Sequence, residues 1–178
     1  MDLFQAISDR RSIRKYKDIP VEEEKLRLLL DAARLAPSWK NRQCWRFLVI
    51  GAAAKKVCLI EAFPEDNPGR KALLQAPLVI VVCADPEESG AENGIDYFIA
   101  DTAIAFAHLC LAAQALGLGT CWMGLYDEGL LKAAAGVPPH FRVVGVTPLG
   151  YPDQEPKARP RKELHEIAYL EEWGVSAW

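Results

Sequence analysis

Three arginines lie within five residues near the start of the chain, at Arg10, Arg11 and Arg14, around the hydroxyl of Ser12. A guanidinium stays charged at physiological pH, and its planar fork of N–H donors matches the oxygens of a phosphate. The cluster therefore predicts a site for a phosphorylated ligand. The alternative is a solvated basic turn before a helix, because basic clusters also occur without a ligand.

A second basic cluster lies near the other end, where Arg159 and Arg161 flank Pro160. In an extended chain, residues two positions apart point to the same side, so these two guanidiniums are able to straddle one phosphate. The whole chain has a formal net charge of −3, so both clusters stand out from an acidic background. Together they predict one anion held between the two ends, and the alternative is a solvated basic tail.

A third group of polar side chains occupies the segment 37–45, which follows a predicted helix. Ser38, Asn41 and Gln43 are uncharged hydrogen-bonding groups, suited to contacting the edge of a heterocycle. The alternative for this segment is helix termination and loop packing. Trp39 belongs more often to packing than to ligand contacts.

The familiar catalytic and nucleotide-binding motifs do not occur. The glycines at 117 and 119 do not continue as G-x-G-x-x-G because Trp122 stands where the third glycine belongs, and neither a P-loop nor a G-x-S-x-G motif is found. The five cysteines are scattered without a C-x-x-C pair and the three histidines lie far apart, so the sequence predicts neither disulfides nor a metal site. This favours chemistry carried by a bound cofactor.

Apolar periodicity predicts the elements that position these residues. A helix is expected from Pro20 to near Pro37, with an acidic first turn that suits the helix dipole. Strands are expected over 45–50, 77–84, 120–123 and 141–149, a short helix from 127 to 135, and extended chain over 151–162. The strand at 77–84 is continuously apolar, which is typical of a central strand covered on both faces.

The segment 95–116 contains neither proline nor glycine and carries apolar residues on nearly every face. A helix of this kind has to be buried. Packing against its copy in a second subunit achieves this, which predicts a homodimer with a large apolar interface. The alternative is the central core helix of a monomer.

Length and composition predict one domain over residues 1–178. The chain is 51% apolar and 25% charged, as in ordinary folded proteins. We expect a cytoplasmic enzyme, because no signal peptide is recognised and no apolar stretch is judged long and uniform enough to span a bilayer. The net charge indicates no general affinity for nucleic acid or anionic membranes, which disfavours a nucleic-acid-binding module built on the two clusters.

Four motifs occur in order between Leu3 and Ile167: R-R-S-I-R, A-P-S-x-x-N-x-Q-x-W-x-F, L-G-L-G-T-C-W and L-G-Y-P-x-x-x-P-x-x-R-P-R-K. In this pattern the chain resembles the flavin-dependent nitroreductases. The resemblance departs at Cys44, where relatives often have proline. It implies an α+β fold with a central, mainly antiparallel sheet flanked by helices, and an intertwined homodimer whose core contains the long buried helix and whose interface holds FMN.

The resemblance also implies the residues of the site. The FMN phosphate, ribityl chain and pyrimidine edge would be contacted by Arg10, Arg11, Ser12 and Arg14, with Arg159 and Arg161 completing the phosphate site. The partner subunit would contribute Pro37, Ser38, Trp39, Asn41 and Gln43. Backbone groups of Gly119, Thr120, Cys121 and Trp122 would lie beside the flavin ring. One residue among Asn67, Arg70 and Lys71 would also reach the flavin.

The function implied is a ping-pong oxidoreductase in which NADH or NADPH reduces FMN at N5 and a small planar acceptor, such as a nitroaromatic or a quinone, is then reduced. No catalytic side chain is assigned, because the chemistry takes place on the flavin. Tyr97 and Phe98 are candidates for an aromatic wall, with core packing as the alternative. Alternative functions are a reductive dehalogenase, a flavin-modifying relative and a non-catalytic FMN-binding protein.

Overall fold

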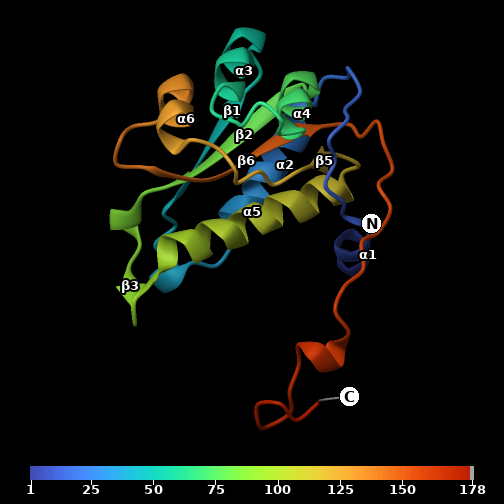
Figure 1. Ribbon diagram of the computed structural model, residues 1–178, viewed down its shortest axis with the longest axis vertical. Helices are drawn as coiled ribbons and strands as arrows, with labels where there is room; N and C mark the ends of the chain where they lie inside the picture. The colour runs from blue at the N-terminus through green and yellow to red at the C-terminus, as the bar shows by residue number, and fades with distance from the viewer. Residues whose placement is uncertain (177–178) are drawn as a thin grey trace.

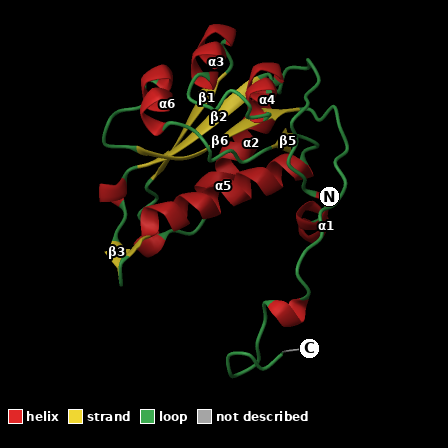
Figure 2. Cartoon of the chain, viewed as in Figure 1, coloured by secondary structure: helices red, strands yellow, loops and turns green. Residues whose placement is uncertain are grey.

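The computed structural model describes residues 1–176, which are built around a four-stranded sheet (Figure 2). Its strands lie in the order β1 (Trp45–Ile50), β2 (Leu78–Ala84), β6 (Arg142–Gly150) and β5 (Gly119–Thr120), and every neighbouring pair is antiparallel. A separate small hairpin pairs β3 (Ala91–Glu92) with β4 (Ile95–Asp96). The predicted α+β fold with a mainly antiparallel sheet is confirmed.

Helices cover both faces of the sheet (Figure 1). One face carries α3 (Ala53–Ile60), α4 (Gly69–Gln75) and α6 (Glu128–Ala135), and the other carries α2 (Glu23–Arg34) and α5 (Tyr97–Ala115). Because side chains alternate along a strand, Val81 of β2 packs in the first layer while Ile80 and Val82 pack in the second. This double burial explains why β2 is apolar at every position.

Both predicted helices on these faces, α2 and α6, are confirmed, although α2 begins at Glu23 rather than at Pro20 and ends at Arg34. Glu22 is the N-cap of α2, whose first turn carries Glu23 and Glu24 beside the positive end of the helix dipole. In α6, the Asp127 side chain accepts a hydrogen bond from the Leu130 N–H. Gly136 ends α6 in the left-handed conformation, with φ of 73°.

Helix α5 runs across the sheet for 19 residues and forms the predicted long apolar helix. Ala105, Phe106 and Leu109 are fully buried against α2 and the sheet, while Ile99 and Ile104 on the opposite side are exposed. By length and composition alone α5 is apolar enough to cross a membrane, contrary to the prediction that no segment qualifies. Its composition instead reflects burial, since the side that faces the sheet needs apolar residues throughout.

The structure differs from the predicted elements in two respects. The strand expected over 120–123 is shorter, because Cys121 donates its N–H to Thr147 Oγ1 and the Trp122 ring turns to stack on Phe106. Three helices lie where none was predicted, namely α3, α4 and α1 (Leu3–Asp9). They are short, at seven or eight residues, and so offer little periodicity to detect.

The C-terminal segment leaves the sheet after β6. It first runs beside the N-terminal segment, with Lys17 N–H donating to Tyr151 O and Asp153 N–H donating to Lys15 O, each at 2.9 Å. Beyond this it extends away from the body of the molecule (Figure 1) and contains the short 3-10 helix η3 (Leu164–Glu166). Exposed apolar side chains in this tail include Leu164, Ile167, Leu170 and Trp173.

Candidate functional site

The two basic clusters meet in one cavity of about 590 Å³, although about 145 residues separate them in the sequence. The backbone hydrogen bonds between residues 15–17 and 151–153 hold the two segments side by side. The cavity is lined by Arg10, Arg11, Ser12 and Arg14 from one segment and by residues 156–161, including Arg159 and Arg161, from the other. The structure thus brings together all six residues that the sequence connects with a phosphate.

The arginines of this cavity differ from most other arginines of the protein in having no acidic partner. Ion pairs hold Arg27, Arg34, Arg46, Arg70 and Arg142, but none of the ion pairs within residues 1–176 involves Arg10, Arg11, Arg14, Arg159 or Arg161. None of the described residues that line the cavity carries a carboxylate. Five guanidiniums without carboxylates create a positive potential, and this donor set fits the phosphate of a cofactor.

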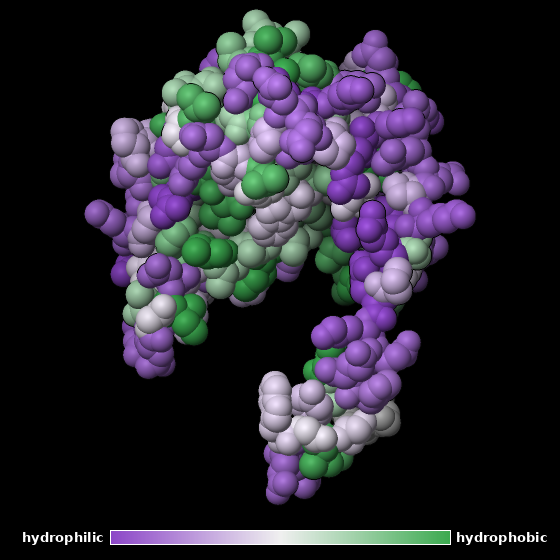
Figure 3. Space-filling view, in the orientation of Figure 1, coloured by the Kyte–Doolittle hydropathy of each residue, from purple (hydrophilic) through white to green (hydrophobic). Residues whose placement is uncertain are grey.

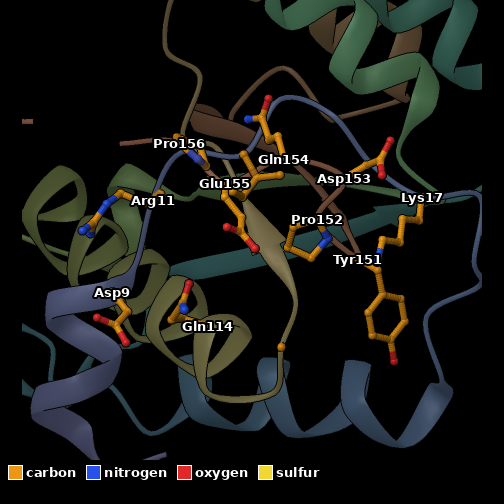
Figure 4. A pocket seen from close by; sticks show the side chains of 12 residues that line it. Asp9, Arg11, Lys17, Gln114, Tyr151, Pro152, Asp153, Gln154, Glu155 and Pro156 are labelled. Atoms are coloured by element: carbon orange, nitrogen blue, oxygen red, sulfur yellow. The ribbon is translucent and has the colours of Figure 1, made fainter. Parts of the chain in front are cut away.

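A neighbouring cavity of about 860 Å³ has a different character (Figure 4). It lies between residues 9–17, residues 151–156 and the end of α5, and it shares Arg11 with the basic cavity. Asp9, Asp153 and Glu155 also line it, which makes it unsuited to a phosphate. The basic cavity is therefore the better anion site, although the neighbouring one is larger.

Strand β5 and the turn after it lie directly against the first arginine cluster. Ile13 donates its N–H to Thr120 O at 2.9 Å, and a Cβ added to Gly119 would lie 2.7 Å from Ile13 Cγ1. Burial raises the pKa of the Cys121 thiol, while the adjacent Arg14 partly offsets this. Within the described residues, no hydrogen bond uses the backbone N–H of Trp122, which leaves this donor free.

The loop 38–43 is held in an unusual backbone conformation. Lys40, Asn41 and Gln43 all have positive φ, at 48°, 56° and 53°. The loop closes on itself, since Gln43 donates its N–H to Ser38 Oγ at 3.0 Å and its side-chain amide to Asn41 Oδ1 at 3.1 Å. Left-handed conformations at residues other than glycine cluster at functional sites.

One chain does not bring this loop to the basic cavity. Trp39 of the loop contacts the first turns of α5. The neighbouring cavity, which shares Arg11 with the basic one, is instead lined by Gln114 near the far end of the same helix. A helix of 19 residues is roughly 28 Å long at about 1.5 Å per residue. The two groups of predicted site residues are therefore at opposite ends of α5.

Comparison with known proteins identifies the family. The model of the nitroreductase family matches residues 7–151. The chain belongs to the nitroreductase family. A Methanothermobacter thermautotrophicus protein described as a candidate NADH dehydrogenase/NAD(P)H nitroreductase is 36% identical, over 97% of this chain and 88% of the relative.

Solved structures agree with this assignment. A nitroreductase family protein from Clostridium novyi has a TM-score of 0.84 and 36% identity, covering 99% of this chain and 97% of its own. A Desulfovibrio desulfuricans protein, described as a candidate nitroreductase and solved in complex with FMN, has a TM-score of 0.83 and 32% identity, covering 97% and 98%. The fold of this nitroreductase-family chain is thus shared along nearly its whole length.

In this nitroreductase-family chain the two aromatic residues at the start of α5 have different environments. Phe98 is 7% exposed and packs with Cys44 and Ala84, which fits the core-packing alternative. Tyr97 is half-buried and stacks on Trp39, with ring centroids 5.9 Å apart. Tyr97 therefore remains the better candidate for an aromatic wall.

The three mid-chain candidates for a flavin contact also differ in their surroundings. Asn67 Oδ1 accepts from the Gly69 N–H at the start of α4, and Arg70 forms an ion pair with Glu61. Lys71 is exposed, and none of the ion pairs within residues 1–176 involves it. Lys71 is therefore the candidate whose charge is free for a ligand.

Sequence reasoning missed one polar residue beside the loop 38–43. Asp101 is 3% exposed and accepts hydrogen bonds from the Trp39 N–H at 2.9 Å and from Ser89 Oγ at 3.1 Å. A signal for it existed, because Asp101 is the one acidic residue of a largely apolar helix. Within residues 1–176, no group of three or more His, Cys, Asp or Glu side chains is placed to hold a metal ion.

Proposed function

We propose that this protein is an FMN-dependent oxidoreductase that takes electrons from NADH or NADPH and passes them to a small planar acceptor. The observation that carries the proposal is the cavity of five arginines without carboxylate partners, formed where the two ends of the chain meet. Membership of the nitroreductase family, and FMN in the related structure from D. desulfuricans, support FMN as the phosphorylated ligand.

In this proposal the residues of the basic cavity hold FMN. Arg159 and Arg161 bind its phosphate together with the first cluster, and Arg10 or Arg14 stabilises negative charge on the pyrimidine edge of the reduced ring. The free Trp122 N–H is a hydrogen-bond donor for the ring. Bound FMN supplies a ring that accepts and returns hydride at N5, so no side chain is required to act as nucleophile.

We propose further that the site is completed in a homodimer. Two copies packed antiparallel along α5 place the loop 38–43 of one subunit near the basic cavity of the other, which one chain does not achieve. The exposed apolar residues Ile99 and Ile104 on α5, and Phe4 on α1, suit such an interface, and Figure 3 shows apolar surface over the region of α5. The extended C-terminal tail supports an intertwined arrangement.

The proposed kinetic order is ping-pong, with the nicotinamide leaving before the acceptor binds in the same place. Nitroaromatics and quinones are the first acceptors to test, because planar molecules stack well on a flavin ring. Double-reciprocal plots at several acceptor concentrations are then expected to be parallel. Intersecting lines would show that donor and acceptor are bound together.

The function is tested by anaerobic spectroscopy of the purified protein. We expect an oxidised-flavin spectrum that NADH or NADPH bleaches within seconds and that a nitroaromatic or a quinone restores. Reoxidation by a halogenated aromatic alone, with release of halide, would indicate the dehalogenase alternative. Bound flavin that neither nicotinamide reduces would indicate a non-catalytic FMN-binding protein, and a protein that binds no FMN would refute the proposal.

A further inference from the structure

The buried carboxyl group of Asp101 joins two segments that are distant in the sequence. Oδ1 accepts from the backbone N–H of Trp39 at 2.9 Å, and Oδ2 accepts from Ser89 Oγ at 3.1 Å. Asp101 lies one turn into α5, so a rigid helix holds both acceptors in place. Each oxygen thus fixes a different segment, one being the loop 38–43 and the other the segment 85–96 that contains the β3–β4 hairpin.

The Trp39 ring packs where these two segments meet. It stacks on Tyr97 with an interplanar angle of 18°, and the Tyr97 N–H donates to Gly90 O at 2.9 Å. A Cβ at Gly90 would overlap the Trp39 ring, so only glycine allows this approach. The Trp39 side chain is therefore fixed by packing while its backbone is fixed by Asp101.

A second link joins the same segments nearer the surface. Arg46 donates to both carboxylate oxygens of Glu88 at 2.7 Å, and its other nitrogen donates to Gln43 O at 3.3 Å. Both side chains of this pair are about half exposed, at 50% and 41%. Exposed ion pairs contribute little in water, so the buried group is the stronger of the two links.

The loop needs such an anchor because its conformation is costly. Lys40, Asn41 and Gln43 have positive φ although none of them is glycine. A residue held in this left-handed conformation is expected to relax unless its surroundings prevent it. The hydrogen bonds inside the loop join only its own residues. The Trp39 N–H bond to Asp101 ties its start to the core.

We propose that Asp101 is a positioning residue: it holds the loop 38–43 in the conformation that completes the cofactor site of the partner subunit, and it joins this loop to the segment 85–96. The part that concerns the cofactor rests on the proposed function. The part that concerns the loop holds for the protein without any ligand, and the two parts are tested separately.

The variants are Asp101→Ala, which removes both acceptors, and Asp101→Asn, which keeps one acceptor and replaces the other with a donor while both hydrogen bonds remain possible. The asparagine oxygen accepts from the Trp39 N–H while its NH₂ donates to Ser89 Oγ. Ser89→Ala is a milder variant that should fold even if Asp101→Ala does not. The matched control is Lys56→Met, because Lys56 is also buried and donates to Leu74 O and Ala76 O, but between α3 and α4.

The first measurement is hydrogen exchange of the protein without FMN. In Asp101→Ala we expect at least about tenfold faster exchange in peptides covering 38–43 and 85–96, as for a lost buried hydrogen bond. Ser89→Ala should accelerate 85–96 alone, and Asp101→Asn should match the wild type. Lys56→Met should leave both segments unchanged even though its thermal midpoint falls. Exchange at the wild-type rate in both segments of Asp101→Ala, or in the segment 85–96 of Ser89→Ala if Asp101→Ala does not fold, would overturn the inference.

The second measurement is the visible circular dichroism and the dissociation constant of bound FMN. Asp101→Ala should alter the flavin spectrum and raise the dissociation constant about tenfold, whereas Asp101→Asn should restore both. If the wild type binds no FMN, the proposed function fails, and the exchange data still decide the role of Asp101 in the loop. If the wild type binds FMN and Asp101→Ala matches it in spectrum and affinity, the positioning role toward the cofactor is refuted.

Discussion

Arginines with and without a carboxylate partner serve different purposes in this protein. Arg27, for example, is exposed on α2 and pairs with Glu23 on the preceding turn, an arrangement that contributes little to stability and leaves little charge for a ligand. Arg159 and Arg161 have no such partner in the described structure and border a cavity. Their charge is therefore available to an anion.

Replacing Arg161 with alanine should weaken FMN binding. One hydrogen bond to a charged phosphate is lost, which contributes about 1.5–3 kcal/mol, so the dissociation constant should rise about tenfold to a hundredfold. Fluorescence titration of the protein after FMN removal measures this. Arg27→Ala is the matched control and should bind FMN as the wild type does, so an equal loss in both variants would argue against a specific phosphate contact.

For single residues, the sequence predicts which side chains are suited to bind a ligand but not that distant ones lie together in the fold. The two arginine clusters are visible as local composition, whereas their convergence depends on the pairing of residues 15–17 with 151–153, which no local pattern encodes. The sequence also did not predict the positive φ values of the loop 38–43. They occur at Lys40, Asn41 and Gln43, and two of these residue types give no sign of a left-handed conformation.

Among the elements, β5 owes its position beside the arginine cluster to Gly119. Replacing it with alanine places a Cβ 2.7 Å from Ile13 Cγ1 and 2.8 Å from Ile13 Cβ, so the backbone has to move. We expect Gly119→Ala to lower the free energy of unfolding by about 1–3 kcal/mol and to weaken FMN binding. Later in the chain, after β5, Gly124→Ala has open space and is the control. Similar thermal midpoints for the two variants would contradict this account.

Helix α6 is tied to β6 by Glu128, which accepts from Arg142 Nε and from the Val143 N–H at 3.0 and 2.9 Å. Burial pushes the pKa of Glu128 upward, but these hydrogen bonds outweigh it and hold the pKa below its ordinary value. A depressed pKa in the folded state means that the stabilisation is present above the unfolded value of about 4.5 and disappears as the pH falls through the folded value.

Glu128→Gln should therefore be less stable than the wild type at pH 7, by about 1 kcal/mol, with the difference shrinking below pH of about 4.5. Thermal midpoints measured from pH 3.5 to pH 7 test this sign. A difference that stays constant over this range would show that the charge of Glu128 is not involved.

Elements with a continuous apolar pattern or clear capping residues were predictable, whereas the short helices α1, α3 and α4 were not. The continuously apolar β2 and the long α5 are confirmed within a residue or two of their predicted bounds. The strand expected over 120–123 was wrong in length because one side-chain hydrogen bond, from Cys121 N–H to Thr147, replaces a strand pairing that its composition favours. Tertiary contacts of this kind override local preference.

For the whole molecule, the distance between the loop 38–43 and the basic cavity is the reason for our proposal that the site is completed in a homodimer. We expect Ile104→Glu to place a charge in the proposed interface and to yield monomers that lose FMN. Analytical ultracentrifugation measures the oligomeric state, and the flavin spectrum measures the amount of bound FMN. Leu130→Glu, on an exposed position of α6 across the sheet, should stay dimeric and retain FMN. A monomeric wild type, or an Ile104→Glu monomer that keeps full flavin, would refute the shared site.

The central claim is that the arginines at both ends of the chain bind the phosphate of FMN, and one comparison tests it most directly. The protein is freed of flavin and titrated with FMN and with riboflavin, which differ by the phosphate. We expect FMN to bind on the order of 100-fold more tightly, and the ratio to fall toward one in the double variant Arg159→Ala, Arg161→Ala. Equal affinity of the wild type for FMN and riboflavin would contradict the claim.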